Sequence, residues 1–186
     1  VDFLAAHVVR GRLIVPGAAL IDMALSAAGL VQAGRAVADM TLTEPLALDD
    51  EAETLVQTIV TQGDAGDSFE ILSLRDGSDD WRRHASGRLV ALGGAPEAPV
   101  QVTGDSAVSG ADHYADLAGR GLTFGPSLRR VERIERLAAT EALGHIDGAA
   151  AHGAHAFQPA LLDACLQIIA GALPETVPGD AAYMPF

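Results

Sequence analysis

Two apolar helical segments, each entered through a proline, constrain most strongly what this chain can fold into. The first covers residues 18–30 directly after Pro16 and Gly17, and the second covers residues 160–173 after Pro159. Their apolar residues recur at helical spacing, and proline suits a helix start because its missing N–H has no partner to lose there. Each half also holds stretches typical of strands. This pattern predicts, twice over, a strongly curved antiparallel sheet wrapped around one buried helix.

The expected strands differ in number between the halves. After the first helix, strands are predicted over residues 38–48, 55–61, 69–74 and 81–92, forming an antiparallel meander. Pro45 indicates an edge or a bulge in the first of them. The second half is expected to hold a short helix over 111–118, a glycine-dense turn over 119–126, and strands near 128–137 and 140–146.

A Pro/Gly-rich polar segment over residues 93–104 is typical of a linker. We therefore expect a single domain over residues 1–186, built from an N-terminal half (1–92) and a C-terminal half (105–186). A chain of 186 residues, 49% of them hydrophobic, is long enough to bury such a core.

Charge and hydropathy argue against two classes of partner. The chain has 25 acidic and 12 basic residues, a net charge of −13, whereas nucleic-acid binding needs basic stripes. Its apolar runs are shorter than the roughly 18 residues that a membrane span needs. With one cysteine, Cys165, and no signal-peptide pattern, we expect a cytoplasmic protein that binds neither nucleic acid nor membranes.

The loop before the first helix is the first candidate site. His7 is followed by Gly11, and then by Pro16 and Gly17 where the helix begins. Free N–H groups in the first turn of a helix, together with the positive end of its dipole, stabilise a negatively charged oxygen. The loop therefore pairs a candidate base, His7, with a candidate oxyanion site at Gly17.

The second helix offers a candidate acid. Asp163 and Gln167 are four residues apart, so they lie on one face of the helix, where Gln167 can hold the carboxyl by a hydrogen bond. The surrounding face is apolar, and burial there favours the protonated carboxyl. The helix dipole favours the anion instead, and the sequence leaves open which effect is larger.

Residues 121–126 (GLTFGP) are a third candidate site. The glycines of this block, Gly121 and Gly125, permit close backbone approach, while Leu122 and Phe124, ahead of Pro126, suit an acyl chain.

Together these motifs resemble the dehydratase domains of modular type I polyketide synthases. The pattern of His7, Gly11 and Pro16, the block at 121–126, and the pair Asp163 and Gln167 occur in that family's order and approximate spacing. The segment 81–87 (WRRHASG) is similar too. The resemblance implies an α+β double hot-dog fold with its active site between the halves. It also implies removal of water from a 3-hydroxyacyl group on the phosphopantetheine arm of an acyl carrier protein, giving an α,β-unsaturated acyl thioester.

This reaction divides into three tasks that match the candidate residues. It needs a base for the α-proton, donors for the enolate-like oxygen, and an acid for the departing hydroxyl. An imidazole such as His7 suits the first task and N–H groups near Gly17 the second. The resemblance assigns the acid role to Asp163. It implies no metal or other cofactor of the domain's own, with the carrier protein, neighbouring synthase domains and a second copy of the chain as partners.

The chain departs from the family pattern in three places. Leu122 and Phe124 replace the usual tyrosines, and Gln158 replaces a common histidine. The sequence also stops at Phe186, so an incomplete second hot dog is expected. Because hydroxyl groups are absent at 122 and 124, a cyclase that closes an oxygen ring by conjugate addition and a double-bond isomerase stay open. A non-catalytic scaffold that binds acyl carriers is a third alternative.

Four further residues are predicted to have no catalytic part. Asp22 is expected to be exposed on the polar side of the first helix. His152 and His155 are expected to be solvated, since no nearby cysteine or carboxylate completes a metal site. Cys165 points off the face of Asp163 and is expected to be a small buried hydrophobe.

Overall fold

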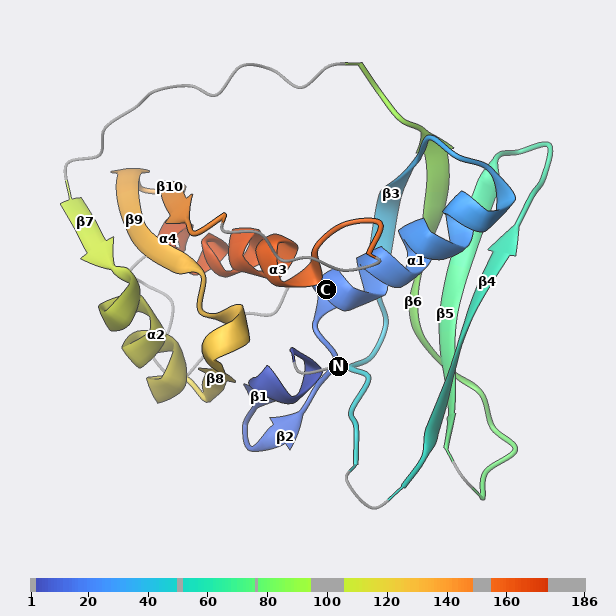
Figure 1. Ribbon diagram of the computed structural model, residues 1–186, viewed down its shortest axis with the longest axis horizontal. Helices are drawn as coiled ribbons and strands as arrows, with labels where there is room; N and C mark the ends of the chain where they lie inside the picture. Colours follow the sequence, from blue (N-terminus) through green and yellow to red (C-terminus); the bar gives the residue numbers. More distant parts are fainter. Residues whose placement is uncertain (1–2, 50–51, 76, 95–105, 149–154, 174–186) are drawn as a thin grey trace. The chain divides into compact units, whose positions relative to one another are not determined.

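The computed structural model describes residues 3–49, 52–75, 77–94, 106–148 and 155–173, and these form two compact units (Figure 1). The described residues 14–94 and 155–159 make up one, here named the four-stranded unit. The described residues up to Leu13, those over 106–148 and those from Ala160 onward make up the other, named the mixed unit. Among the described residues, no helix is long and apolar enough to cross a membrane.

The four-stranded unit consists of a long helix lying against a curved antiparallel sheet (Figure 1). The sheet order is β3-β6-β5-β4, and helix α1 packs against β3, β4 and β5. The element bounds are α1 (Gly17–Val31), β3 (Arg35–Leu42), β4 (Thr54–Thr61), β5 (Asp67–Arg75) and β6 (Arg82–Ala91). The predicted helix and four strands are therefore present, with shifted ends. Pro16 is the N-cap of α1, with φ −63° and ψ 145°, rather than its first helical residue.

Strand β3 is the part of this sheet that the sequence predicted least well. It pairs with β6 and lies at the edge of the sheet, which confirms the edge position that Pro45 indicated, but only β4, β5 and β6 form the expected meander. It ends at Leu42, before Pro45, because a proline has no N–H to contribute to the ladder. The register shift lies between Ala38 and Thr41, where Asp39 has φ 50°, and not at Pro45.

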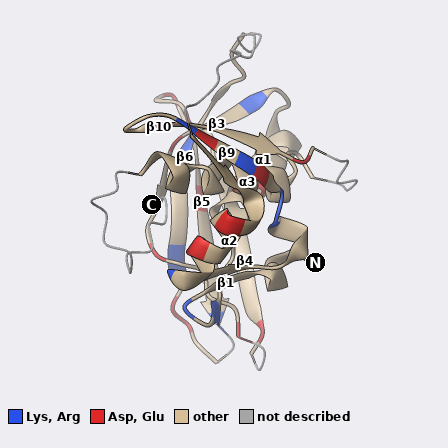
Figure 2. Ribbon diagram, turned by 90° about the vertical axis from the view of Figure 1, so that its left-hand side faces the viewer, with Lys and Arg blue, Asp and Glu red and all other residues tan. Residues whose placement is uncertain are grey.

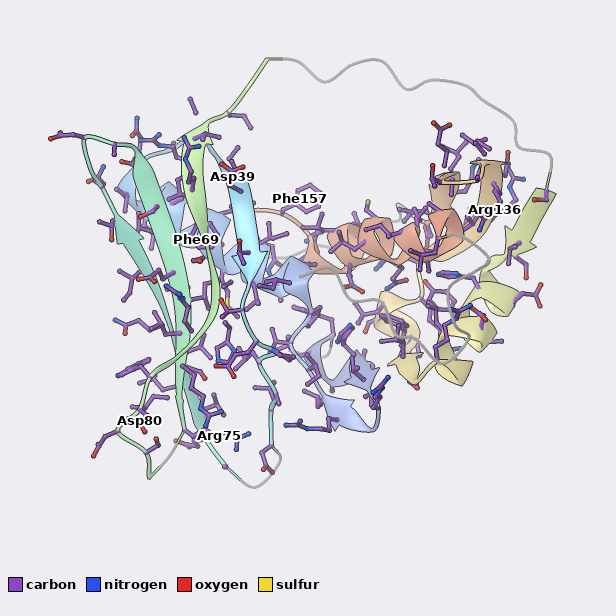
Figure 3. The ribbon with its side chains drawn as sticks, turned by 180° about the vertical axis from the view of Figure 1, so that it is seen from behind. Asp39, Phe69, Arg75, Asp80, Arg136 and Phe157 are labelled. Carbon is purple, nitrogen blue, oxygen red and sulfur yellow. The ribbon has the colours of Figure 1, made fainter. Side chains whose placement is uncertain are left out.

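Small residues allow the core of this unit to pack closely. Ala18 and Ala24 of α1 are fully buried, as are Phe69 and Ile71 of β5. A Cβ on Gly87 of β6 would lie 2.7 Å from the ring of Phe69, which is labelled in Figure 3, so only glycine fits there without displacing that ring.

The mixed unit contains two three-stranded sheets, ordered β2-β1-β8 and β10-β9-β7. Its apolar core is shared by helices α2 and α3 with strands β8 and β9. The strands are β1 (His7–Val9), β2 (Arg12–Leu13), β7 (Ser106–Ser109), β8 (Leu122–Phe124), β9 (Val131–Ala138) and β10 (Glu141–Ile146). The α-helices are α2 (Gly110–Gly119), α3 (Pro159–Gln167) and α4 (Ile169–Ala172), and the 3-10 turns are η1 (Leu4–Ala6) and η2 (Pro126–Leu128).

Several predictions for this unit were wrong in detail. The turn over 119–126 contains strand β8, and the strand expected from residue 128 begins at Val131 because η2 precedes it. The helix expected over 160–173 is divided at Ile168. The side chain of Ile168 packs closely on Gly144, where an added Cβ would lie 2.0 Å from Cδ1 of the isoleucine. Gly171, a weak helix former, follows in α4.

The two units do not follow the chain in simple order. Strand β1 pairs with β8, so the N-terminal residues through Leu13 belong with elements far along the sequence. The division into halves 1–92 and 105–186 stays a prediction. Most of the expected linker lies outside the described residues, as does the C-terminal end of the chain.

Candidate active site

His7 is positioned by strand pairing. It is the first residue of β1 and lies opposite Phe124 of β8. The two rings meet edge to face, with centroids 5.3 Å apart and an interplanar angle of 68°. The N–H of Gly125 donates to the carbonyl of Ala6 at 2.7 Å, and a Cβ on Gly125 would lie only 2.8 Å from that of Ala6. Glycine at 125 therefore lets β8 approach the backbone that carries His7.

Gly11 belongs to the turn that follows β1. Arg10 and Gly11 connect β1 to β2 and have φ of 48° and 77°, the left-handed values found at both central positions of a type I′ hairpin. The N–H of Arg10 donates to the carbonyl of Gly121 at 2.7 Å. The positive φ at Gly11 is a sufficient physical reason for a glycine there. The turn itself holds the end of β1 that is farther from His7.

Asp163 and Gln167 lie together on α3 and are both buried. Their exposed fractions are 5% and 7%, and Nε2 of Gln167 donates to Oδ2 of Asp163 at 2.6 Å. Burial raises the pKa of Asp163 above its usual range, while the charge of His7 and the bond from Gln167 lower it by less. Since Asp163 is in the second turn of α3, the helix dipole acts on it weakly. Burial is therefore the larger of the two effects that the sequence left open.

The electrostatic interaction between His7 and Asp163 joins the two candidate catalytic groups within one unit. His7 comes from β1 near the beginning of the chain, and Asp163 comes from α3 near its end. An imidazole and a buried carboxyl that favours its protonated form can act as a base and an acid on one substrate.

Sequence reasoning missed Tyr114, a buried residue of α2. Its hydroxyl donates to Oε1 of Gln167 at 2.8 Å and accepts from the N–H of Val131 at 3.0 Å. Nε2 of Gln167 also donates to the carbonyl of Leu128 at 3.3 Å. The available signal was a tyrosine three residues before Leu117 on an amphipathic helix, because a buried tyrosine hydroxyl usually has a partner.

The block over 121–126 contributes to the core of the mixed unit. Leu122 and Phe124 are buried, while Thr123 between them is exposed, as expected for alternating residues of a strand. The ring of Phe124 lies between its two aromatic neighbours, 6.0 Å from that of Tyr114 by centroids. Pro126 follows as the first residue of η2.

Pro16 and Gly17 belong to the four-stranded unit. Pro16 is fully buried, and Gly17 begins α1, where a Cβ would lie 3.3 Å from Leu42. The oxyanion role of Gly17 stays a prediction.

Asp22 is buried, contrary to expectation, with 8% of its surface exposed. Its carboxylate accepts hydrogen bonds from Nδ1 of His155 at 2.8 Å and from the N–H of Phe157 at 3.0 Å. These partners compensate for burial of the carboxylate. No spacing in the sequence indicates them, because they are distant from Asp22 along the chain. Figure 3 labels Phe157, which is itself nearly half exposed.

Two other expectations for polar residues have different outcomes. Cys165 is exposed on α3 rather than buried, because it points away from the face of Asp163. His152 lies outside the described residues. Within the described ranges, no three His, Cys, Asp or Glu side chains gather closely enough to hold a metal ion.

Comparison with known proteins gives consistent matches along the chain. Residues 1–74 match a family model described as polyketide synthase dehydratase domain, and residues 94–186 match one described as polyketide synthase dehydratase N-terminal domain. The spectinabilin polyketide synthase system protein NorA of Streptomyces orinoci is 37% identical over 184 residues. That alignment covers 93% of this chain and 10% of NorA, so the chain corresponds to a small part of its relative.

Two crystal structures of dehydratases are similar along most of the chain. An inactive CurJ dehydratase mutant with histidine replaced by phenylalanine, in complex with a compound, has a TM-score of 0.78 and 27% identity, covering 92% of this chain and 62% of that one. An inactive CurK dehydratase mutant with aspartate replaced by asparagine has a TM-score of 0.83 and 26% identity, with coverages of 99% and 68%. The fold class is thus the α+β double hot-dog of these domains. The chain belongs to the polyketide synthase dehydratase domain family.

Proposed function

We propose that this chain removes water from a 3-hydroxyacyl thioester carried on the phosphopantetheine arm of an acyl carrier protein. One observation carries the proposal: a buried carboxyl with a raised pKa, Asp163, interacts electrostatically with the imidazole of His7 inside one compact unit. Membership of the dehydratase family supports the same reaction class.

The elimination uses one base and one acid. The imidazole of His7 takes the proton from Cα, and the electron pair of that bond forms the Cα–Cβ double bond. The Cβ–O bond breaks as Asp163 gives its proton to the departing oxygen, which leaves as water. Burial of Asp163 favours the protonated form that this step consumes. Proton exchange with solvent then restores neutral imidazole and protonated carboxyl.

The hydrogen bond from Gln167 distinguishes the two oxygens of Asp163. Nε2 of Gln167 can only donate, and the carbonyl oxygen of a protonated carboxyl accepts hydrogen bonds better than its hydroxyl oxygen, so this bond to Oδ2 favours the acidic proton on Oδ1. Oδ1 is therefore the oxygen that delivers the proton to the substrate hydroxyl. Gln167 thus acts as an orienting residue.

The remaining candidates are proposed to bind or orient the substrate. The N–H of Gly17, at the start of α1, is proposed to stabilise the enolate-like thioester oxygen. Phe124 orients the imidazole by its edge contact with His7. The acyl carrier protein and neighbouring synthase domains are the proposed partners, with a homodimer as the proposed assembly. These steps call on no cofactor of the domain's own.

The deciding experiment follows turnover of a 3-hydroxyacyl pantetheine thioester by chromatography and mass spectrometry, with a trapping thiol that reacts with the alkene product. His7→Ala and Asp163→Asn should each reduce water loss by about a hundredfold or more, the usual contribution of a general acid or base. The inactive CurJ mutant lacks a histidine and the inactive CurK mutant lacks an aspartate, the same two residue types, which supports these choices.

Two matched controls accompany these variants. His145→Ala removes a partly exposed imidazole of β10, and Asp116→Asn removes a largely exposed carboxylate of α2; both should leave turnover unchanged. Unchanged turnover in His7→Ala would remove His7 as the base. A ring product that the thiol does not trap would favour cyclisation, and binding of the carrier without turnover by the wild type would favour the scaffold.

A further inference from the structure

The hydroxyl of Tyr114 lies at the centre of a buried hydrogen-bond chain that ends at Asp163. Tyr114 of α2 donates to Oε1 of Gln167, and Nε2 of the same amide donates to Oδ2 of Asp163. All three side chains are at most 7% exposed. Two helices far apart in the sequence are thereby connected through one amide group.

The neighbouring backbone fixes the direction of these bonds. The N–H of Val131 donates to the tyrosine oxygen at 3.0 Å, which leaves the hydroxyl proton for an acceptor. Oε1 of Gln167 is the nearer acceptor at 2.8 Å, while the carbonyl of Leu128 is 3.3 Å away. When Oε1 of Gln167 faces Tyr114, Nε2 faces Asp163 and Leu128. Its two hydrogens are then accepted by Oδ2 of Asp163 and by the carbonyl of Leu128.

We propose that Tyr114 is a positioning residue for the acid of the dehydration, acting through the Gln167 amide to keep an N–H donor on Oδ2 of Asp163. The proposal rests on the proposed function, because it gives Tyr114 a part in deciding which oxygen of Asp163 carries the transferable proton. Tyr114 itself need not touch the substrate.

The tyrosine ring is held by contacts that do not involve its hydroxyl. Its ring lies 5.2 Å from that of His113 and 6.0 Å from that of Phe124, and the guanidinium of Arg129 lies 5.6 Å above it. Tyr114→Phe keeps these contacts and removes only the oxygen. Among the described residues, the titratable or charged groups that face Asp163 or this tyrosine are His7 from β1, His113 from α2 and Arg129, just before β9.

The test measures the pKa of Asp163 by NMR titration of protein labelled with ¹³C at the aspartate carboxyl, with Asp163→Asn to identify its signal. In Tyr114→Phe, the loosened amide stabilises the carboxylate less, so the pKa of Asp163 should rise. Gln167→Leu should raise it further. Adding Tyr114→Phe to Gln167→Leu should then cause no additional shift, because the proposed route runs through the amide.

Turnover provides the second readout. Tyr114→Phe should lower kcat by about fivefold, the value of one ordinary hydrogen bond, with little change in KM. Ser73→Ala is the matched control, since it removes a buried hydroxyl from the four-stranded unit, where Ser73 is bonded to His84. That variant should leave both the pKa of Asp163 and kcat unchanged.

The outcomes separate this inference from the proposed function. An unmoved pKa of Asp163 in Tyr114→Phe, or equal shifts with and without Gln167, overturns the inference even if turnover falls. Absence of turnover in the wild type overturns the proposed function and leaves the titration result intact.

A second measurement avoids substitution altogether. The chain has two tyrosines, Tyr114 and Tyr183, so uniform 3-fluorotyrosine labelling introduces two fluorine signals, which Tyr183→Phe assigns. The signal of Tyr114 should show an inflection at the pKa of Asp163 that disappears in Asp163→Asn. A fluorine chemical shift of Tyr114 that does not change as Asp163 titrates contradicts the inference.

Discussion

His7 and Phe124 lie opposite each other in an antiparallel strand pair, and their rings meet edge to face at 5.3 Å. The residue before His7 and the residue after Phe124 explain how the two rings come together. Gly125 approaches Ala6 so closely that no side chain fits between them, and its N–H bonds the Ala6 carbonyl. The position of the proposed base thus depends on a backbone contact one residue away.

Gly125→Ala should therefore displace β1 from β8. Its Cβ would lie 2.8 Å from Cβ and 3.2 Å from Cα of Ala6, and the backbone atom cannot rotate away. We expect a loss of about 1–3 kcal/mol in the free energy of unfolding, together with reduced turnover, as measured by urea titration and by the dehydration assay. Gly119→Ala is the control, because a Cβ there meets nothing within 4 Å. Equal stability of the two variants would show that the close approach is unimportant.

Asp163→Asn should stabilise the protein at pH values above the ordinary carboxyl pKa, although it reduces water loss by about a hundredfold or more. Folding raises the pKa of Asp163, so the native state binds this proton more tightly than the unfolded chain does. Stability from this group is therefore fully present below the unfolded pKa, about 3.9, and is lost as pH rises through the raised folded pKa. Asparagine removes that loss.

Urea unfolding midpoints from acidic to neutral pH test this sign. The gain in Asp163→Asn should grow with pH, whereas Asp116→Asn should show no such growth, since Asp116 is largely exposed and paired with Arg120. Acidic residues of α2, the helix that carries Asp116, are red in Figure 2. A variant that loses stability toward neutral pH would contradict the raised pKa.

Asp22→Ala should destabilise the four-stranded unit and loosen the segment before α3. It removes the acceptor for His155 and for the N–H of Phe157, and hydrogen bonds to a charged group contribute about 1.5–3 kcal/mol each. Hydrogen exchange should show lost protection at the Phe157 amide. Ser26→Ala, at an exposed position of the same helix, should leave that protection unchanged. Retained protection in Asp22→Ala would mean that the carboxylate does not hold this segment.

Gly29→Ala and Gly34→Ala should have opposite effects on stability. A Cβ at either residue meets nothing within 4 Å, so packing does not distinguish them. Gly29 lies inside α1, where alanine should stabilise by about 0.5–1 kcal/mol. Gly34 has φ 74°, which costs alanine about 1–2 kcal/mol. Calorimetric melting temperatures should therefore move in opposite directions, and a shift of the same sign in both would contradict the conformational argument.

Periodic segments were predictable from the sequence because their signals are local. The apolar spacing after Pro16 predicted α1, and the alternation over 55–61 predicted β4. The spacing of Asp163 and Gln167 likewise placed both on one face of α3, where the hydrogen bond between them is present.

Non-local features were not predictable in this way. Strands β1 and β8 are three residues each, too short to show a period, and the pairing of β3 with β6 depends on long-range contacts. Burial of Asp22 and the hydrogen bonds of Tyr114 depend on partners that no spacing rule connects. The oxyanion role of Gly17 stays a prediction.

The pairing of β1 with β8 also sets an order for biosynthesis. As the polypeptide leaves the ribosome, the four-stranded sheet has all its strands once Ala91 has been made, because β3 to β6 are contiguous. The edge of β1 that pairs with β8 has no partner strand until Phe124 has been synthesised, and His7 can interact with Asp163 only after that later residue has been added. The nascent chain therefore acquires its sheet early and its proposed catalytic pair among its last tertiary contacts.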